Sequence, residues 1–176
     1  MQNLFLRFLL VAALAIGSII LLAPSAFAQS ECAPVSGTVY GWFTDTWHGT
    51  GEFAVGRKVL HMKLLVVNTS FFDDGNLYRG TETWTFDFGK GDTIQAKTQF
   101  ITEHMTDAAS SSGVFHVTEV GQFGNGTGKF YGAYGSLTTT GPFGPSVKVP
   151  DNVKVPPDAQ MIWYGPYQGM LCGMRN

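Results

Sequence analysis

TETWTFDFGKGDTIQAKTQFITEH, residues 81–104, contains two alternating segments that meet at Gly89-Lys90-Gly91. Side chains alternate between the two faces of a β-strand, and a short glycine-rich connection is typical of a tight hairpin. One face of this hairpin is mostly aromatic or apolar and is expected to point inward: Glu82, Trp84, Phe86, Phe88, Ile94, Ala96, Thr98, Phe100, Thr102 and His104. The stretch therefore predicts an antiparallel pair with one buried face.

Further short segments rich in Val, Thr, Phe, Tyr and Trp recur between Gly or Asp/Asn turns, and helical periodicity is almost absent. Strands are expected over Val35–Phe43, Val59–Asn68, Thr81–Phe88, Thr93–Glu103, Val114–Val120, Lys129–Thr140 (broken near Gly135) and Met161–Leu171. Loops are expected over Ser70–Gly80, Thr106–Gly113 and Gly141–Pro157. Seven or eight strands suit an all-β fold, a small antiparallel eight-stranded β-barrel, because closure removes exposed sheet edges.

The first 28 residues have the pattern of a secretory signal peptide. Arg7 precedes the apolar run FLLVAALAIGSIILLA, and Ala26-Phe27-Ala28 is a small-residue cleavage site. This run is shorter than the roughly 20 residues that cross a bilayer, which favours cleavage over a retained anchor. We therefore expect a secreted or periplasmic protein, with a signal peptide at 1–28 and a single barrel domain at 29–176.

The charge of the expected mature chain is low. It keeps all 13 acidic residues and all but one of the 11 basic ones, with no basic cluster. This argues against nucleic acid or an anionic membrane surface as a partner. The four histidines are scattered and no HExxH motif occurs, so no metal site and no cofactor is expected. A homo-oligomer is compatible with the sequence.

The two cysteines, Cys32 and Cys172, lie near opposite ends of the mature chain. Export places them where disulfides form and persist, which favours a bridge between them over two free buried thiols. A bond between them would close a loop of about 140 residues, and in the chain-entropy model it would stabilise the fold by roughly 4 to 5 kcal/mol.

A glycine-rich segment, GTGKFYGAYGSL at Gly126–Leu137, lacks the helix and the Lys-Ser/Thr of a phosphate-binding loop. It resembles the GTG-x-F-x-x-A-x-G signature of the allene oxide cyclase and dirigent barrel superfamily. The matching positions are Gly126, Thr127, Gly128, Phe130, Ala133 and Gly135. The resemblance implies an eight-stranded antiparallel barrel with an apolar central cavity. At these positions we expect an architectural role: the glycines form a corner, and Phe130 plugs the end of the barrel.

Inward-facing polar residues are the candidates for chemistry. Glu82 is expected beside Trp84, where burial would raise the pKa of its carboxyl and suit it to acid or base catalysis. The alternative is a solvated residue at the barrel rim. His104 is a second catalytic candidate, with a hydrogen-bonded structural role as its alternative. His116 shares a face with Val114 and Val120 and is expected inward, although the apolar residues on the opposite face leave its direction ambiguous.

Aromatic residues are abundant enough to line a cavity for an apolar or aromatic ligand. The candidates for this lining are Tyr40, Trp84, Phe86, Phe100 and Tyr164. The leading hypothesis is a barrel that binds a small hydrophobic molecule. The second is a cofactor-independent cyclase or isomerase that folds a flexible substrate, with Glu82 moving a proton. The third is an interaction protein whose barrel is filled by its own side chains.

Overall fold

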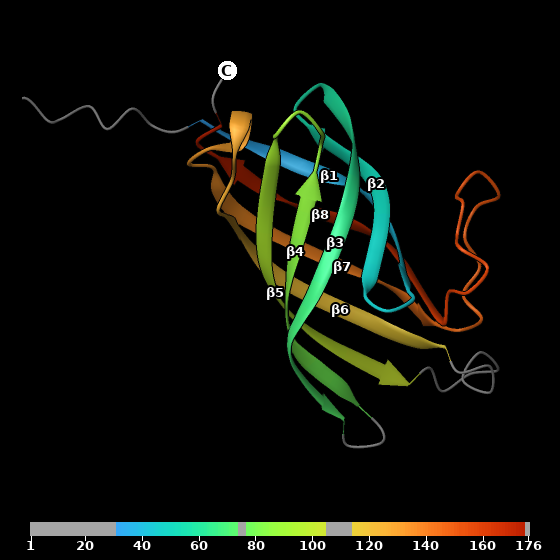
Figure 1. Cartoon of the computed structure of the whole chain (residues 1–176). Coiled ribbons are helices and arrows are strands. Elements are labelled where there is room, and N and C mark those ends of the chain that lie inside the picture. The colour runs from blue at the N-terminus through green and yellow to red at the C-terminus, as the bar shows by residue number, and fades with distance from the viewer. Residues whose placement is uncertain (1–30, 74–76, 105–113, 175–176) are drawn as a thin grey trace, which may run out of the picture. The chain divides into compact units, whose positions relative to one another are not determined.

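The computed structural model describes residues 31–73, 77–104 and 114–174. In these ranges, eight strands form a closed antiparallel barrel in which successive strands pair and β8 pairs back with β1 (Figure 1). The strands are β1 (Cys32–Phe43), β2 (Trp47–Val55), β3 (Lys58–Asp73), β4 (Tyr78–Asp87), β5 (Thr93–His104), β6 (Phe115–Gly124), β7 (Tyr134–Gly144) and β8 (Met161–Cys172). The predicted all-β, eight-stranded antiparallel barrel is confirmed.

The hairpin of residues 81–104 forms as expected. β4 and β5 pair from Asp87 and Thr93 at the turn, and Gly89, Lys90 and Gly91 all take positive φ angles, of 77°, 56° and 82°. The predicted inward face is buried: Trp84 is 1% exposed, and Phe86 and Ile94 are 0% exposed. Alternation in this stretch therefore fixes which side chains enter the barrel.

The sequence predicts no strand over Trp47–Val55, and here the structure corrects it, because β2 occupies this segment. Gly49 and Gly51 are of a residue type common in turns, but here they lie within β2 and pair with residues of β1. A Cβ on Gly49 would lie 2.5 Å from the carbonyl oxygen of Tyr40, and one on Gly51 would lie 2.4 Å from that of Thr38. Glycine is required because the two backbones approach so closely.

The predicted loop Ser70–Gly80 is wrong over most of its length. β3 continues to Asp73, β4 begins at Tyr78, and the two pair up to this end, after a register shift between Asn68 and Ser70. Such a shift is a β-bulge, which lets a strand continue through residues that break its alternation. Residues 74–76, and the whole of the predicted loop Thr106–Gly113, lie outside the described residues.

The predicted strand Lys129–Thr140 is wrong at its start. Gly128–Phe130 forms one turn of 3-10 helix, and β7 begins only at Tyr134. β7 also takes the first residues of the predicted loop Gly141–Pro157. Gly128 has φ 57°, and the turn is attached to the β4–β5 hairpin, because the backbone N–H of Lys129 donates to Oδ1 of Asp92 at 3.0 Å.

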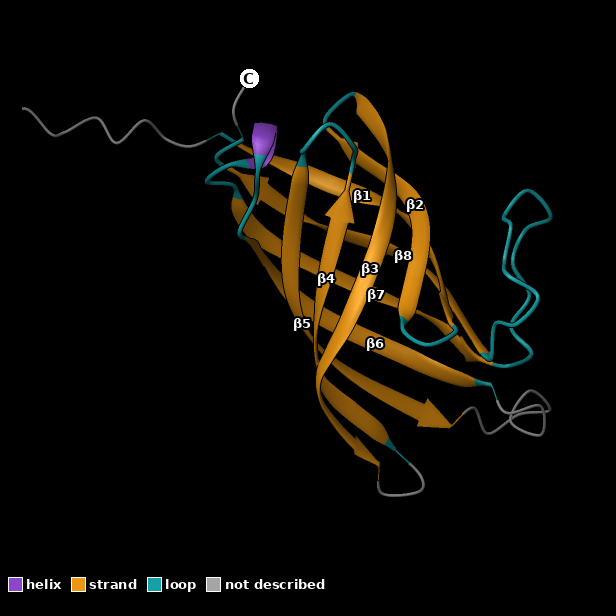
Figure 2. Cartoon of the chain, viewed as in Figure 1, coloured by secondary structure: helices purple, strands orange, loops and turns teal. Residues whose placement is uncertain are grey.

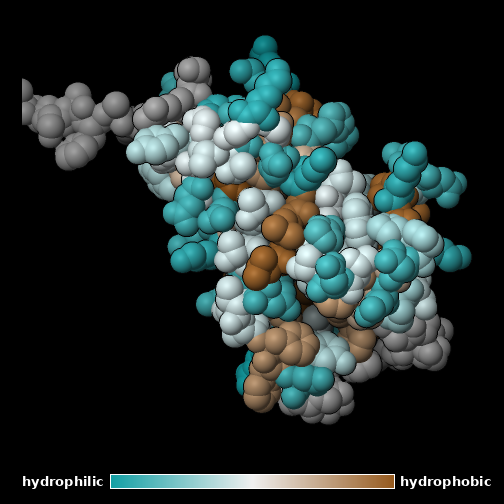
Figure 3. Space-filling model, viewed as in Figure 1, coloured by the Kyte–Doolittle hydropathy of each residue, from teal (hydrophilic) through white to brown (hydrophobic). Residues whose placement is uncertain are grey.

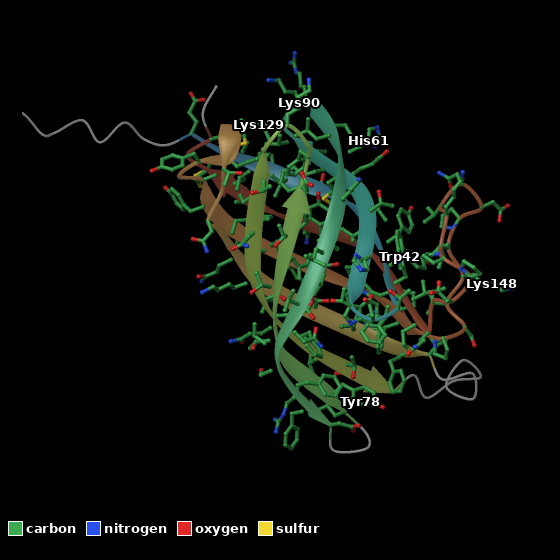
Figure 4. The ribbon with its side chains drawn as sticks, viewed as in Figure 1. Trp42, His61, Tyr78, Lys90, Lys129 and Lys148 are labelled. Atoms are coloured by element: carbon green, nitrogen blue, oxygen red, sulfur yellow. A yellow bond between two sulfur atoms is a disulfide. The ribbon has the colours of Figure 1, made fainter. Side chains whose placement is uncertain are left out.

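One end of the barrel, here called the packed end, is filled by aromatic rings around Phe53. Phe53 is 0% exposed, and five ring centroids lie within 5.2 to 6.1 Å of its own. These rings belong to Phe86, Phe88, Phe123, Phe130 and Tyr167. Figure 2 shows the turn of helix at this end, and Figure 4 shows Lys90 and Lys129 there. Phe130, 0% exposed, closes the packed end as the sequence predicts.

The predicted disulfide is confirmed. Cys32 and Cys172 are bonded and lie directly opposite each other in the pairing of β1 with β8. β1 and β8 are the first and last strands of the chain, so the bond covalently closes the seam of the barrel.

The outer surface mixes polar and apolar side chains. Among the large apolar residues that face solvent, Leu65 and Val67 on β3 are 40% and 50% exposed. Figure 3 shows apolar atoms near the middle of this face, surrounded by hydrophilic ones. No helix within the described residues has the length and hydropathy needed to cross a membrane.

Candidate functional site

A cavity of about 310 Å³ lies inside the other half of the barrel, here called the cavity end. Its lining includes Phe71 near the end of β3, Tyr78 at the start of β4 and Met161 at the start of β8. Cys172 of the disulfide lies at the other end of β8. Figure 4 shows one of them, Tyr78, at the opposite end of the barrel from Lys90 and Lys129. The cavity reaches the surface, since its lining includes Phe71, which is 57% exposed.

The cavity wall is mainly aromatic. Seven aromatic side chains contribute to it: Trp47, Phe71, Tyr78, Trp84, Phe100, Phe143 and Trp163. They pack on one another, with ring centroids 5.1 Å apart for Trp84 and Trp163 and 5.6 Å apart for Trp47 and Phe143. Leu64, Val66 and Val117 add aliphatic surface. A concave, mostly apolar wall with a few polar groups is typical of small-molecule sites.

Two glutamates, Glu82 and Glu119, are the acidic side chains in this wall. β5 lies between their strands, where Glu82 pairs with Thr98 and Glu119 pairs with Phe100. Both side chains point inward and are buried, at 9% and 5% exposed. Glu82 is therefore a buried residue of the wall and not a solvated rim residue.

Glu82 has a defined hydrogen-bond donor. The indole Nε1–H of Trp84, two residues along β4 and on the same face, donates to Oε1 of Glu82. A donor held by packing fixes the orientation of the carboxyl and stabilises its ionised form. By contrast, Oε2 of Glu119 is buried and accepts no hydrogen bond from the described part of the chain.

The two carboxyls influence each other's protonation. Burial raises the pKa of Glu82, and hydrogen bonds with Trp84 and Glu119 oppose that rise. The pKa of Glu119 is raised well above that of an ordinary glutamic acid, first by burial, then by the charge of Glu82 and a hydrogen bond with it. Glu119 is thus the member that keeps its proton to higher pH.

A second polar atom in the wall also lacks a partner. The indole Nε1 of Trp163 is buried without a hydrogen bond to the described residues, and the whole residue is 5% exposed. Buried N–H groups are nearly always paired, so an unpaired one in a cavity wall marks a place where a bound molecule would supply an acceptor.

The structure brings together only some of the residues predicted for the site. Trp84 and Phe100 line the cavity, whereas Phe86 points inward at the packed end. The prediction that Tyr40 and Tyr164 line the cavity is wrong, because neither is part of its wall. The two rings stack on each other on the outside of β1 and β8, with their centroids 6.0 Å apart. The inward positions beside them are taken by Val39 and Trp163, which are buried.

The histidines do not join the glutamates. His104 ends β5, but its side chain lies outside the described residues. The direction of His116, which the sequence leaves ambiguous, is outward: the residue is exposed, and its Nε2 lies 3.2 Å from Oγ1 of Thr140. Phe115, Val117 and Glu119 take the inward positions of β6 instead.

Sequence reasoning missed Glu119 as a site residue. The available signal was its place in the alternating set Phe115, Val117, Glu119 and Phe123, which has more apolar character than the set containing His116. Three aromatic wall residues, Phe71, Tyr78 and Phe143, were also missed because the sequence places them in the predicted loops Ser70–Gly80 and Gly141–Pro157, whereas they lie in β3, β4 and β7.

The rest of the described chain offers no metal site, since no group of three or more His, Cys, Asp or Glu side chains is placed to hold an ion there. The chain matches no protein-family model, no curated protein and no solved structure.

Proposed function

We propose that the protein is an exported barrel that binds one small hydrophobic or aromatic molecule in the cavity. The observation that carries the proposal is the aromatic-walled cavity of about 310 Å³ with buried polar atoms in its wall. This is about twice the volume of a 150 Å³ cavity that accommodates benzene, so it suits a molecule of about two fused rings. A barrel filled by its own side chains would offer no such space.

Export fits the same picture. The signal-like residues 1–28 and the bond between Cys32 and Cys172 both suit an oxidising compartment outside the cytoplasm. The resemblance of Gly126–Gly135 to the allene oxide cyclase and dirigent superfamily supports the proposal, because barrels of that superfamily have an apolar central cavity. In the protein, that segment lies at the packed end and closes it.

The proposal is tested by native mass spectrometry of the protein purified from its own host, together with titration of naphthalenemethanol followed by tryptophan fluorescence. Val66→Phe would fill part of the cavity, whereas Val120→Phe, at a site 52% exposed on the outside of β6, is the matched control. We expect Val66→Phe to weaken binding at least about tenfold and the control to leave it unchanged. Equal binding by both variants, or no binding by the wild type, would contradict the proposal.

A second function, a cyclase or isomerase, is favoured by one observation, the presence of two buried glutamates, Glu82 and Glu119, in the same cavity wall. A protonated Glu119 beside a more acidic Glu82 offers a proton donor and a proton acceptor within one apolar cavity, as an isomerisation requires. The test is turnover of any molecule that co-purifies with the protein. Unchanged turnover in Glu82→Gln would remove Glu82 as the acid or base.

A further inference from the structure

Within the described residues, the buried glutamates have no cationic partner. No Lys or Arg of residues 31–73, 77–104 and 114–174 lines the cavity, and neither Glu82 nor Glu119 takes part in an ion pair there. The ionised form of this pair is therefore stabilised by neutral donors alone, the indole N–H of Trp84 on Glu82 and the side chain of Thr98 beside Glu119, and by the proton that the pair holds. Buried carboxylates are normally paired with a positive charge, because leaving water is costly for an ion.

The surroundings of the pair suit a cation in a second way. Trp84 holds Glu82 through its N–H and packs against Trp163, with their ring centroids 5.1 Å apart and their planes at 69°. Trp47 and Phe143 form another ring pair in the same wall. The faces of aromatic rings attract ammonium groups, most strongly for tryptophan and when water is excluded.

From this arrangement we propose that the ligand is an aromatic amine whose protonated nitrogen binds between the carboxyls of Glu82 and Glu119. This inference rests on the proposed function and names the ligand class for the same cavity. The ammonium donates hydrogen bonds to carboxylate oxygens, including the unpartnered Oε2 of Glu119. The aromatic body of the ligand fills the apolar wall.

The unpaired indole N–H of Trp163 adds a detail of specificity. Its donor has no acceptor among the described residues, so an oxygen on the ligand at that point would gain a hydrogen bond at no cost to the protein. An amine that also carries a hydroxyl or ether oxygen should therefore bind more tightly than the plain amine. A carboxylic acid of the same size is excluded by repulsion from the two glutamates.

Binding of an ammonium changes the proton held by the pair. Before binding, the pair holds a proton, chiefly on Glu119, and the arriving positive charge replaces that proton as the partner of the second carboxyl. Among the described residues, the other titratable side chains in the cavity wall are His48 and Tyr78, and His48 lies 3.8 Å from Asp45 at the surface. Uptake of the amine should thus release up to one proton.

The test is isothermal titration of the full mature protein at pH 7 with three probes of matched size: 1-naphthylmethylamine, 1-naphthalenemethanol and 1-naphthoic acid. We expect the amine to bind at least about tenfold more tightly than the alcohol and the acid to bind least. Repeating the amine titration in buffers of different ionisation enthalpy should reveal proton release that the alcohol does not cause.

Variants locate the effect. The double variant Glu82→Gln/Glu119→Gln keeps the shape of the wall but removes its charge, so the amine and the alcohol should bind equally, with the alcohol affinity within about twofold of the wild type. Glu103→Gln, which alters an exposed glutamate on β5, is the matched control and should keep the amine preference. Circular dichroism checks that each variant is folded.

The outcomes separate the two proposals. An alcohol that binds as tightly as the amine, or an amine preference that survives in the double variant, overturns the amine inference while the hydrophobic-ligand function stands. Absence of binding by all three probes overturns both.

Discussion

The two ends of the barrel are built from the same alternating strands but are used differently. At the packed end, six rings, those of Phe53 and its five neighbours, fill the interior, and one of the five, Phe130, comes from the glycine-rich segment. At the cavity end, similar aromatic residues stand around a space of about 310 Å³ and two buried glutamates. Inward alternation is common to both ends, but among the described residues only the packed end has rings that meet at its centre and fill the interior.

The two ends should differ most in how much stability the protein loses when an aromatic ring is truncated to alanine. Phe53→Ala at the packed end should lower the free energy of unfolding by about 4 kcal/mol, because it removes a ring packed on all sides. Phe100→Ala at the cavity end should lower it by about 2 kcal/mol, because one side of Phe100 already borders open space. Urea unfolding of both variants measures the difference. Equal losses would mean that the cavity end is packed as tightly as the other.

The disulfide is the next largest contribution. Replacing Cys32 and Cys172 together with serine opens a loop spanning 140 residues in the unfolded chain. It should lower the free energy of unfolding by about 3 kcal/mol, the usual cost of removing a disulfide and less than the roughly 4 to 5 kcal/mol of the chain-entropy model. The check is denaturant unfolding, compared with that of the wild type under reducing and non-reducing conditions. A reductant that leaves the wild-type midpoint unchanged would contradict the assignment of this bond as a clamp on the seam.

Stability should depend on pH through the cavity end. The pKa values of Glu82 and Glu119 are raised in the folded state, so their contribution is fully present below the unfolded value of about 4.3 and is lost as the pH rises through their folded values. Glu119→Gln should remove much of this loss and raise stability at pH 7 by about 1 kcal/mol. Thermal melts from pH 5 to pH 8 measure it, with the outward Glu103→Gln as the control. A wild-type melting temperature that rises steadily over this range would reverse the sign and defeat the account.

The smallest expected effect concerns the attachment of the plug at the packed end. Nζ of Lys129 lies 3.0 Å from Oδ2 of Asp92, and the bonds from Lys129 hold the pKa of Asp92 below its usual value. Asp92→Asn should slightly destabilise the protein, and added salt should reduce the difference from the wild type. Salt-dependent melts check this. A loss as large as that of Phe53→Ala would show that the ion pair, and not ring packing, holds the plug.

Much of the barrel follows from the sequence because its signals are local. The alternation in residues 81–104 identifies the inward face of β4 and most of β5, and Cys32 with Cys172 identifies the clamp on the seam. These features depend on residue type and spacing alone. They are therefore visible without knowing which strands pair.

The errors arise where pairing overrides local preference. Gly49 and Gly51 indicate a turn, yet they lie within β2 because β1 passes too close for a side chain. The bulge after Asn68 extends β3 beyond the point where its alternation ends. Tyr40 and Tyr164 have the composition of a cavity wall but occupy the outward parity of their strands.

The candidate site was only half predictable for the same reason. Glu82 stands out because Trp84 and Phe86 share its face, but Glu119 becomes its partner only when β5 brings β4 and β6 to either side. A pair of carboxyls from strands more than 30 residues apart leaves no spacing pattern in the sequence. The closed sheet creates it.

Binding of a hydrophobic ligand in the cavity can be tested by following the indole N–H signals of the four tryptophans by NMR while naphthalenemethanol is added. Trp47, Trp84 and Trp163 line the cavity, whereas Trp42 follows the inward Gly41 and faces outward (Figure 4). The account predicts saturable shifts for the first three signals, with Trp42 and the backbone amides of Phe53 and Phe130 unchanged. Shifts confined to Trp42, or shifts spread equally over both ends of the barrel, would contradict it.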